Sequence, residues 1–117
     1  MSLDNFRNDF EYLLKKAIHL TGGKSERVIV LSIPDWGCTP YAVDKNGAEI
    51  GVEIDSFNHV CDQFSKKYHT GYINITEETR AARNNADTLA SDQLHYSGIT
   101  HFKWATHLAN YMLKICQ

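Results

Sequence analysis

Residues 28–31 read Val28-Ile29-Val30-Leu31, a continuous apolar run that is mostly β-branched. Such a short, uninterrupted run is typical of a strand that is buried on both faces, as in a parallel sheet covered by helices. We therefore expect a strand from Arg27 to Ile33, which Pro34 ends. A second short run, Tyr72-Ile73-Asn74-Ile75, predicts another strand within residues 71–75.

Segments whose apolar residues recur at helical spacing lie before and after each predicted strand in the sequence. The first helix is expected to begin near Leu3 or Asp4, with Ser2 or Asp4 as its cap, and to end at Gly22-Gly23. A second helix is expected from about Ala48 to Tyr68. Its apolar residues are spaced alternately by four and three: Ile50, Ile54, Phe57, Cys61, Phe64 and Tyr68.

Two more helices are expected in the last third of the chain. Thr76 is expected to cap a short helix whose first turn is acidic. A final helix is expected to begin near Gly98 or Thr100 and to reach Ile115. Its predicted buried stripe consists of Ala105, Leu108, Ala109, Met112 and Cys116.

The order of these elements is helix, strand, helix, strand, short helix, helix. Strands that are joined through helices pair in parallel. Because two parallel strands are too few for a sheet covered on both faces, the pattern is that of the latter part of a doubly wound α/β domain. We expect one domain over residues 1–117.

Composition excludes several classes of protein. The 117 residues carry a formal net charge of -2, with 43% hydrophobic and 22% charged residues, so a disordered chain or a dedicated nucleic-acid binder is disfavoured. The longest apolar run is too short to cross a bilayer.

The cysteines, Cys38, Cys61 and Cys116, form no CxxC motif, and we interpret them as small buried residues. Reduced thiols suit the cytoplasm, while removal of a signal peptide would be compatible with secretion.

The segment with the most specific chemistry is Asp92-Gln93-Leu94-His95, just before the last helix. At a spacing of three on a loop, a carboxylate can accept a hydrogen bond from one imidazole nitrogen and stabilise the imidazolium. The other nitrogen is then free to take a proton from a nucleophile. A turn aspartate beside a surface histidine is the alternative interpretation of the same motif.

Three segments together resemble the SGNH/GDSL hydrolase family, in particular its lysophospholipase-like esterases. Residues 29–37, followed by Thr39-Pro40, resemble the family's penultimate strand and its loop. Residues 72–76 resemble the last strand, and residues 92–98 resemble the family's D-x-L-H-x-S/N pattern. The resemblance extends from the first helix to the last.

The resemblance implies a flavodoxin-like three-layer α/β/α fold, of which this chain is the C-terminal part, and an esterase or lipase activity. Asp92 and His95 match the acid and the base of the family's catalytic triad. The chain contains no Gly-Asp-Ser nucleophile motif and no Gly-x-Asn-Asp, so this truncated chain alone is expected to be inactive. The expected substrate is a small acyl ester, such as a lipid or an acylated sugar, and no cofactor is expected.

Asp35 and Trp36 follow the first predicted strand, on the loop that borders the substrate cleft in the family. Trp36 is therefore a candidate to line an acyl or sugar pocket. A turn aspartate and a packing tryptophan are the equally weighted alternative.

Two other classes of function stay open. The chain could be a non-catalytic module that is stabilised by self-association, because the edge of the strand near Val28–Ile33 is uncharged and would lack a neighbour. We therefore expect a homo-oligomer through this edge. A histidine metal site is the least favoured class: His59 and Asp62 have a suitable spacing, but no second cluster supports them.

Overall fold

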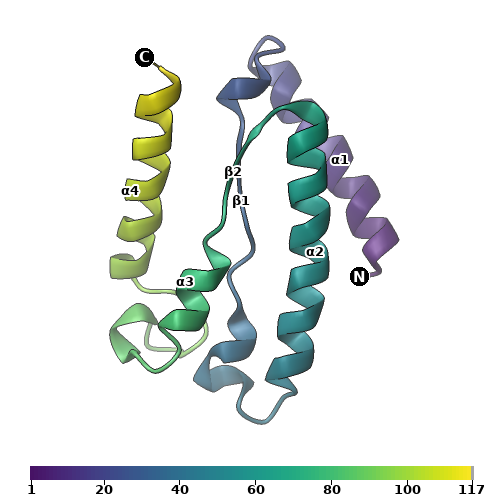
Figure 1. Ribbon diagram of the computed structural model, residues 1–117. Helices are drawn as coiled ribbons and strands as arrows, with labels where there is room; N and C mark the ends of the chain where they lie inside the picture. Colours follow the sequence, from purple (N-terminus) through teal and green to yellow (C-terminus); the bar gives the residue numbers. More distant parts are fainter. Residues whose placement is uncertain (117) are drawn as a thin grey trace. The chain divides into compact units, whose positions relative to one another are not determined.

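A computed structural model describes residues 1–116 as a mixed α/β structure, mostly helical, with four helices and one two-stranded parallel sheet (Figure 1). This confirms the α/β class. The chain forms two compact units. The first contains residues 1–33 and 54–74, and the second contains residues 34–53 and those from Ile75 onward. No helix among residues 1–116 combines the length and the apolar character that a membrane span requires.

The first unit holds the sheet. It contains α1 (Leu3–Leu20), most of α2 (Gly47–Tyr68), β1 (Ile29–Leu31) and β2 (Gly71–Ile73). The two strands are parallel, with Val30 opposite Tyr72, so the predicted parallel pairing is confirmed. The helix α2, which lies between the strands in sequence, provides the connection that parallel strands need.

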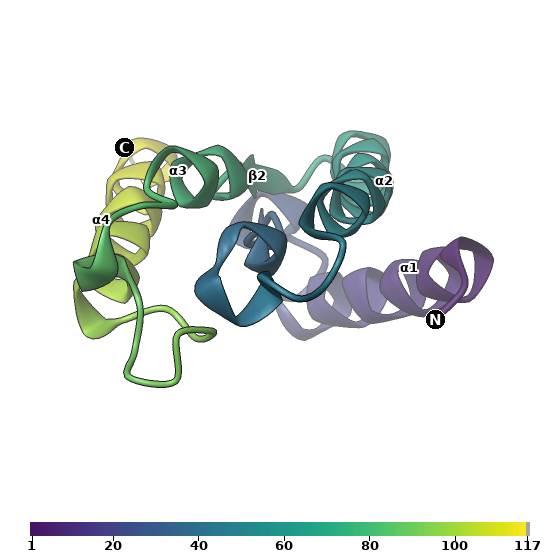
Figure 2. The same cartoon turned by 90° about the horizontal axis from the view of Figure 1, so that it is seen from below.

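The core of the first unit lies between α1, α2 and one face of the sheet. Leu14, Val60 and Phe64 are its buried centre. Phe6 and Phe57 meet edge to face with ring centroids 4.6 Å apart, and α1 lies beside α2 in both views (Figure 1, Figure 2). The six apolar residues predicted for one face of α2 are all buried or half-buried, so the periodicity identified that face correctly. Partly buried residues complete this core: Phe6, Phe10, Ile18, Val28, Val30 and Tyr68.

The ends of α1 follow the predicted signals. The Ser2 hydroxyl accepts a hydrogen bond from the Asn5 amide at 3.1 Å, which makes Ser2 the N-cap. At the other end, Gly22 and Gly23 have φ values of 71° and 82°. Only glycine adopts this left-handed conformation without strain, so the Gly22-Gly23 pair ends the helix as expected.

The strands differ from the prediction in length and in burial. β1 and β2 each cover three residues, and residues 25–27, just before β1, form a 3₁₀ turn. All three residues of β1 are half-buried, whereas burial on both faces was predicted. That prediction is wrong because the sheet has only two strands within residues 1–116, so the second edge of β1 has no neighbouring strand.

The second unit contains two whole helices, α3 (Thr76–Ala81) and α4 (Gly98–Ile115), together with the first turns of α2. It also contains three 3₁₀ turns, at residues 36–38, 40–42 and 86–88. The prediction that Thr76 caps α3 is wrong. Ile75 occupies the N-cap without a side-chain hydrogen bond, and Thr76 is the buried first residue of the helix. The cap of α4 is Ser97, whose hydroxyl accepts from the Thr100 amide.

The predicted buried stripe of α4 is also wrong. Met112 is 48% exposed, and Cys116 is exposed, which further contradicts its interpretation as a buried thiol. α4 carries two adjacent apolar stripes, and the one that is partly buried contains Trp104, Leu108 and Tyr111 beside Thr100. The other faces solvent, and its large exposed residues are Ile99, Phe102, Met112 and Leu113.

Candidate functional site

The loop before α4 is held by its own backbone. Leu89 and Tyr96 form an isolated antiparallel bridge, and the Ala90 amide donates to the His95 carbonyl at 2.8 Å. Between them the chain turns back, with the Gln93 amide bonded to the Ala90 carbonyl and Gln93 at a φ of 60°. This turn brings Asp92 and His95 to the same side of the loop.

Asp92 and His95 are in direct contact. Oδ2 of Asp92 lies 2.6 Å from Nδ1 of His95. The other carboxylate oxygen, Oδ1, accepts from the backbone amides of Leu94 and His95, each at 3.0 Å. The carboxylate–imidazole contact that the spacing predicted is therefore present, and the two amide bonds hold the carboxylate in position.

The electrostatics of this pair favour a charged carboxylate. The hydrogen bond from the His95 ring, followed by those from the Leu94 and His95 amides, lowers the pKa of Asp92 to about 2. Asp92 therefore carries a negative charge at neutral pH. A fixed negative charge at Nδ1 fixes the tautomer of a neutral imidazole and stabilises the imidazolium when Nε2 takes a proton.

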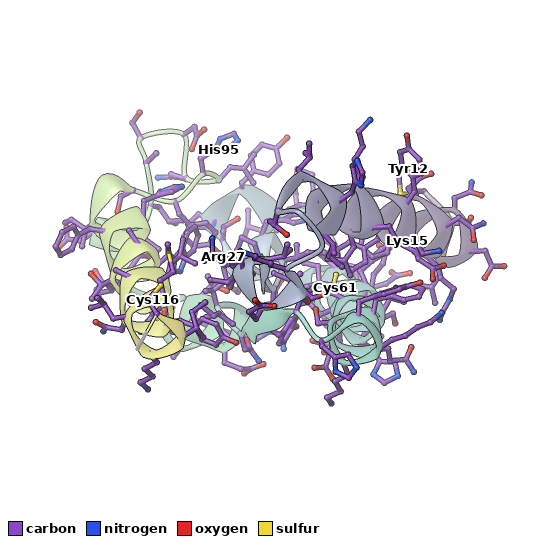
Figure 3. The ribbon with its side chains drawn as sticks, turned by 90° about the horizontal axis from the view of Figure 1, so that it is seen from above. Tyr12, Lys15, Arg27, Cys61, His95 and Cys116 are labelled. Carbon is purple, nitrogen blue, oxygen red and sulfur yellow. The ribbon has the colours of Figure 1, made fainter. Side chains whose placement is uncertain are left out.

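His95 is open to solvent. Its side chain is 74% exposed, and Figure 3 shows it on the loop that leads into α4. Within residues 1–116, His95 has no side-chain partner other than Asp92, so Nε2 is free. No serine, threonine or cysteine hydroxyl or thiol of this part of the chain contacts that nitrogen. The arrangement is a positioned base without a nucleophile.

Tyr96 anchors the loop to another part of the second unit. Its hydroxyl donates to the Asp35 carbonyl at 3.0 Å, and its ring packs against Trp104 with centroids 5.3 Å apart. Burial raises the pKa of Tyr96. A second link joins the Tyr41 amide to the Gln93 carbonyl at 3.3 Å. The residue next to the candidate base is therefore fixed, although His95 itself projects into solvent.

Asp35, predicted to border a substrate cleft, forms a buried ion pair. Its Oδ2 lies 2.8 Å from Nε of Arg80, and its Oδ1 accepts from the Gly37 amide at 2.8 Å. The Asp35 amide donates to the Thr79 hydroxyl, and Nη2 of Arg80 donates to the Gly51 carbonyl. Asp35 is only 4% exposed. These contacts join the loop after β1 to α2 and α3.

The contacts of Trp36 are with its own loop. Its ring lies 6.3 Å from that of Tyr41, at a tilt of 59°, and it is half-buried. Both oxygens of the neighbouring Asp35 already accept hydrogen bonds. A cleft-lining role stays a prediction for Asp35 and Trp36, while the observed contacts of both are those of residues that build the loop.

Sequence reasoning missed Arg80 and Tyr96. A spacing of three on a helix lets Glu77 and Arg80 interact, and Nη1 of Arg80 lies 2.9 Å from Oε1 of Glu77. Nothing in the sequence connects Arg80 with Asp35, 45 positions earlier. In the sequence, Tyr96 is singled out only as part of the family motif. A tyrosine in a polar loop is nevertheless a signal, because its apolar ring can pack against the protein while its hydroxyl donates a hydrogen bond.

A cavity of about 380 Å³ lies beside Tyr96, between α3 and α4. Its threonines already donate to backbone carbonyls: Thr79 to Thr76, Thr88 to Asn85 and Thr100 to Thr88. Neither Asp92 nor His95 lines it. The cavity and the candidate acid–base pair are therefore separate features.

Metal chemistry receives no support from the described part of the chain. Residues 1–116 contain no group of three His, Cys, Asp or Glu side chains that could hold a metal ion. His107, one of the histidines of α4, instead contacts a carboxylate, with Nε2 2.5 Å from Oε1 of Glu78.

Comparison with known proteins gives no matching family model, no matching curated protein and no matching solved structure.

Proposed function

We propose that this chain supplies the acid and the base of a serine ester hydrolase site of the SGNH/GDSL type. Asp92 orients the ring and His95 acts as the base. The finer fold that accompanies this proposal is the C-terminal part of a flavodoxin-like three-layer α/β/α domain. The serine belongs to a polypeptide segment outside these 117 residues.

One observation carries the proposal. Nδ1 of His95 contacts a carboxylate that two backbone amides hold in place, while Nε2 is free and exposed. In a surface histidine with an unrestrained ring, by contrast, neither nitrogen is held by a fixed partner, so the two nitrogens have no separate roles. The sequence around the pair, with its D-x-L-H-x-S/N pattern, supports the same assignment.

In the proposed reaction, the serine oxygen attacks the ester carbonyl and His95 takes the serine proton on Nε2. The imidazolium then gives this proton to the departing alcohol, which leaves an acyl-enzyme. Water then attacks the acyl-enzyme while His95 takes its proton, and His95 returns that proton to the serine oxygen as the carboxylic acid leaves. Asp92 keeps its charge throughout and stabilises the imidazolium.

The test is to join the chain to the polypeptide encoded directly upstream of it and to measure hydrolysis of aryl esters. The proposal expects a Gly-Asp-Ser segment in the added polypeptide. It also expects activity that falls at least about 10³-fold in His95→Ala and in the serine variant. His101→Ala, a change at another exposed histidine, is the matched control and should leave activity unchanged. Activity that His95→Ala does not reduce contradicts the proposal, as does an upstream segment without a nucleophile.

A second candidate function is a non-catalytic module stabilised by self-association. The observation that favours it is the uncovered edge of β1, which has no neighbouring strand within residues 1–116. In this case Asp92 and His95 would form only a turn, and the joined polypeptide would have no His95-dependent activity.

A further inference from the structure

The free edge of β1 has defined limits. In the parallel ladder, the Val28 carbonyl accepts from the Gly71 amide at 2.8 Å and the Ser32 amide donates to the Ile73 carbonyl at 2.9 Å. Backbone groups alternate in direction along a strand, so those of Val28, Val30 and Ser32 face β2. The amides and carbonyls of Ile29 and Leu31 therefore point to the opposite edge.

Asn58 closes one end of that edge. Its Oδ1 accepts from the Ile33 amide at 2.8 Å, and its Nδ2 donates to the Ile33 carbonyl at 3.4 Å. A buried side-chain amide thus replaces a neighbouring strand at Ile33. At the other end the chain turns away into the 3₁₀ turn of residues 25–27. The open part is three residues long and is centred on Val30.

We infer that this edge pairs with the same edge of a second copy of the chain, in antiparallel orientation, with Val30 opposite Val30 of the second copy. In this register Ile29 of each copy lies opposite Leu31 of the other. Both residues direct their amide and carbonyl outward, so each of the two Ile29–Leu31 pairs exchanges two hydrogen bonds. The two-fold axis passes through the Val30 pair.

Self-complementarity is what selects a second copy as the partner. The open edge presents two donors and two acceptors in an order that is unchanged by a two-fold rotation, which is the requirement of an isologous interface. No charged side chain lies in residues 28–33 to oppose pairing, and charge is a usual protection of exposed edges. Pairing also extends a two-stranded sheet, which is marginal in water, to four strands.

This inference is independent of the proposed hydrolase site, because β1 and the Asp92–His95 loop belong to different compact units. The dimer is inferred for the 117-residue chain alone: in the joined polypeptide of the hydrolase proposal, a strand of the upstream segment would occupy this edge of β1 instead.

The experiment measures mass by light scattering and sedimentation from about 1 to about 100 µM, a range that detects micromolar association. The wild-type chain should be a dimer in this range. Leu31→Pro removes an outward amide while leaving the Val30 ladder intact, and it should be monomeric. Leu31→Ala loses the same side-chain packing but keeps the amide, so it is the matched control and should still dimerise.

Amide hydrogen exchange of the wild-type chain gives a second readout that does not depend on whether Leu31→Pro folds. The Ile29 and Leu31 amides should be protected at high concentration and should exchange faster on dilution, whereas the Val30 amide should be protected at both. Three results overturn the inference: a wild-type monomer throughout, Ile29 and Leu31 exchange that is independent of concentration, or a dimer that Leu31→Pro leaves intact. A dimer that Phe102→Glu dissociates instead would place the interface on the exposed stripe of α4.

Discussion

The Asp92 carboxylate and the His95 imidazole meet through one pair of atoms, Oδ2 and Nδ1, which lie 2.6 Å apart. Oδ1 is bonded to two backbone amides, and Nε2 of His95 is free. An exposed ion pair of long side chains loses much of its strength to side-chain entropy. Here the aspartate is short and held by the turn, so the ring is oriented without burial.

The first prediction concerns the titration of Asp92. Its pKa of about 2 lies below the ordinary 3.8, so the carboxylate stabilises the fold above about pH 4. That stabilisation is lost as the pH falls through about 2. We expect a carboxyl ¹³C titration midpoint near 2. In His95→Ala the midpoint should rise toward 3.8 but stay below it, because the two amide bonds remain.

The control for this titration is His101→Ala, which should leave the Asp92 midpoint unchanged. A midpoint near 3.8 in the wild-type chain would mean that the contact between Asp92 and His95 is not maintained in solution.

The second prediction concerns the stability of the second unit. Removing one partner of a buried ion pair leaves the other charge buried, so Arg80→Met should lower the free energy of unfolding by about 3 kcal/mol. Arg80→Lys should be intermediate, because lysine cannot reproduce bonds to both Asp35 and Gly51. Urea unfolding measures the free energy of unfolding of both variants.

The exposed Arg83 provides the matched control variant, Arg83→Met, which should change the free energy of unfolding by less than about 0.5 kcal/mol. Equal effects at the two arginines would show that the Asp35–Arg80 pair has no special importance.

The third prediction concerns the close approach of Gly37 and Gly47. A Cβ on Gly37 would lie 2.6 Å from the Gly47 carbonyl oxygen, a backbone atom that cannot move away alone. Gly37→Ala should therefore destabilise the second unit by about 2 kcal/mol, as measured by thermal or urea unfolding. At Gly98 no atom lies within 4 Å of a built Cβ, so Gly98→Ala is the control and should be neutral. A neutral Gly37→Ala would show that this contact is absent in solution.

The fourth prediction concerns the isolated chain. The 117-residue polypeptide should hydrolyse short aryl esters no faster than its His95→Ala variant, because no nucleophile contacts Nε2 within residues 1–116. A fluorophosphonate probe should label no serine. Turnover that is lost in His95→Ala, together with a labelled serine, would reveal a nucleophile within this chain.

The sequence was most informative where a signal is local. The apolar periodicity of α2, the Gly22-Gly23 terminator and the parallel pairing follow from near neighbours and chain connectivity, and all three are observed. The contact between Asp92 and His95 also lies within one turn, so its spacing was enough to predict it.

Predictions failed where the answer depended on distant residues. The burial of β1 requires strands on both sides, and only one is present in the described residues. α4 has two apolar stripes, and periodicity alone cannot say which of them meets the rest of the unit. Likewise, Asp35 finds Arg80 only through folding, so an apparent loop residue proved to be the centre of a buried network.

The tautomer of neutral His95 decides whether Asp92 orients this ring as a base, because it reports which ring nitrogen Asp92 holds. Long-range ¹H–¹⁵N spectra should be recorded under conditions in which the imidazole is neutral, for the wild-type chain and for Asp92→Ala. We expect neutral wild-type His95 to carry its proton on Nδ1, with Nε2 as an unprotonated acceptor, and Asp92→Ala to lose this preference. A wild-type His95 protonated mainly on Nε2, or one that Asp92→Ala leaves unchanged, would contradict the assignment of His95 as a base oriented by Asp92.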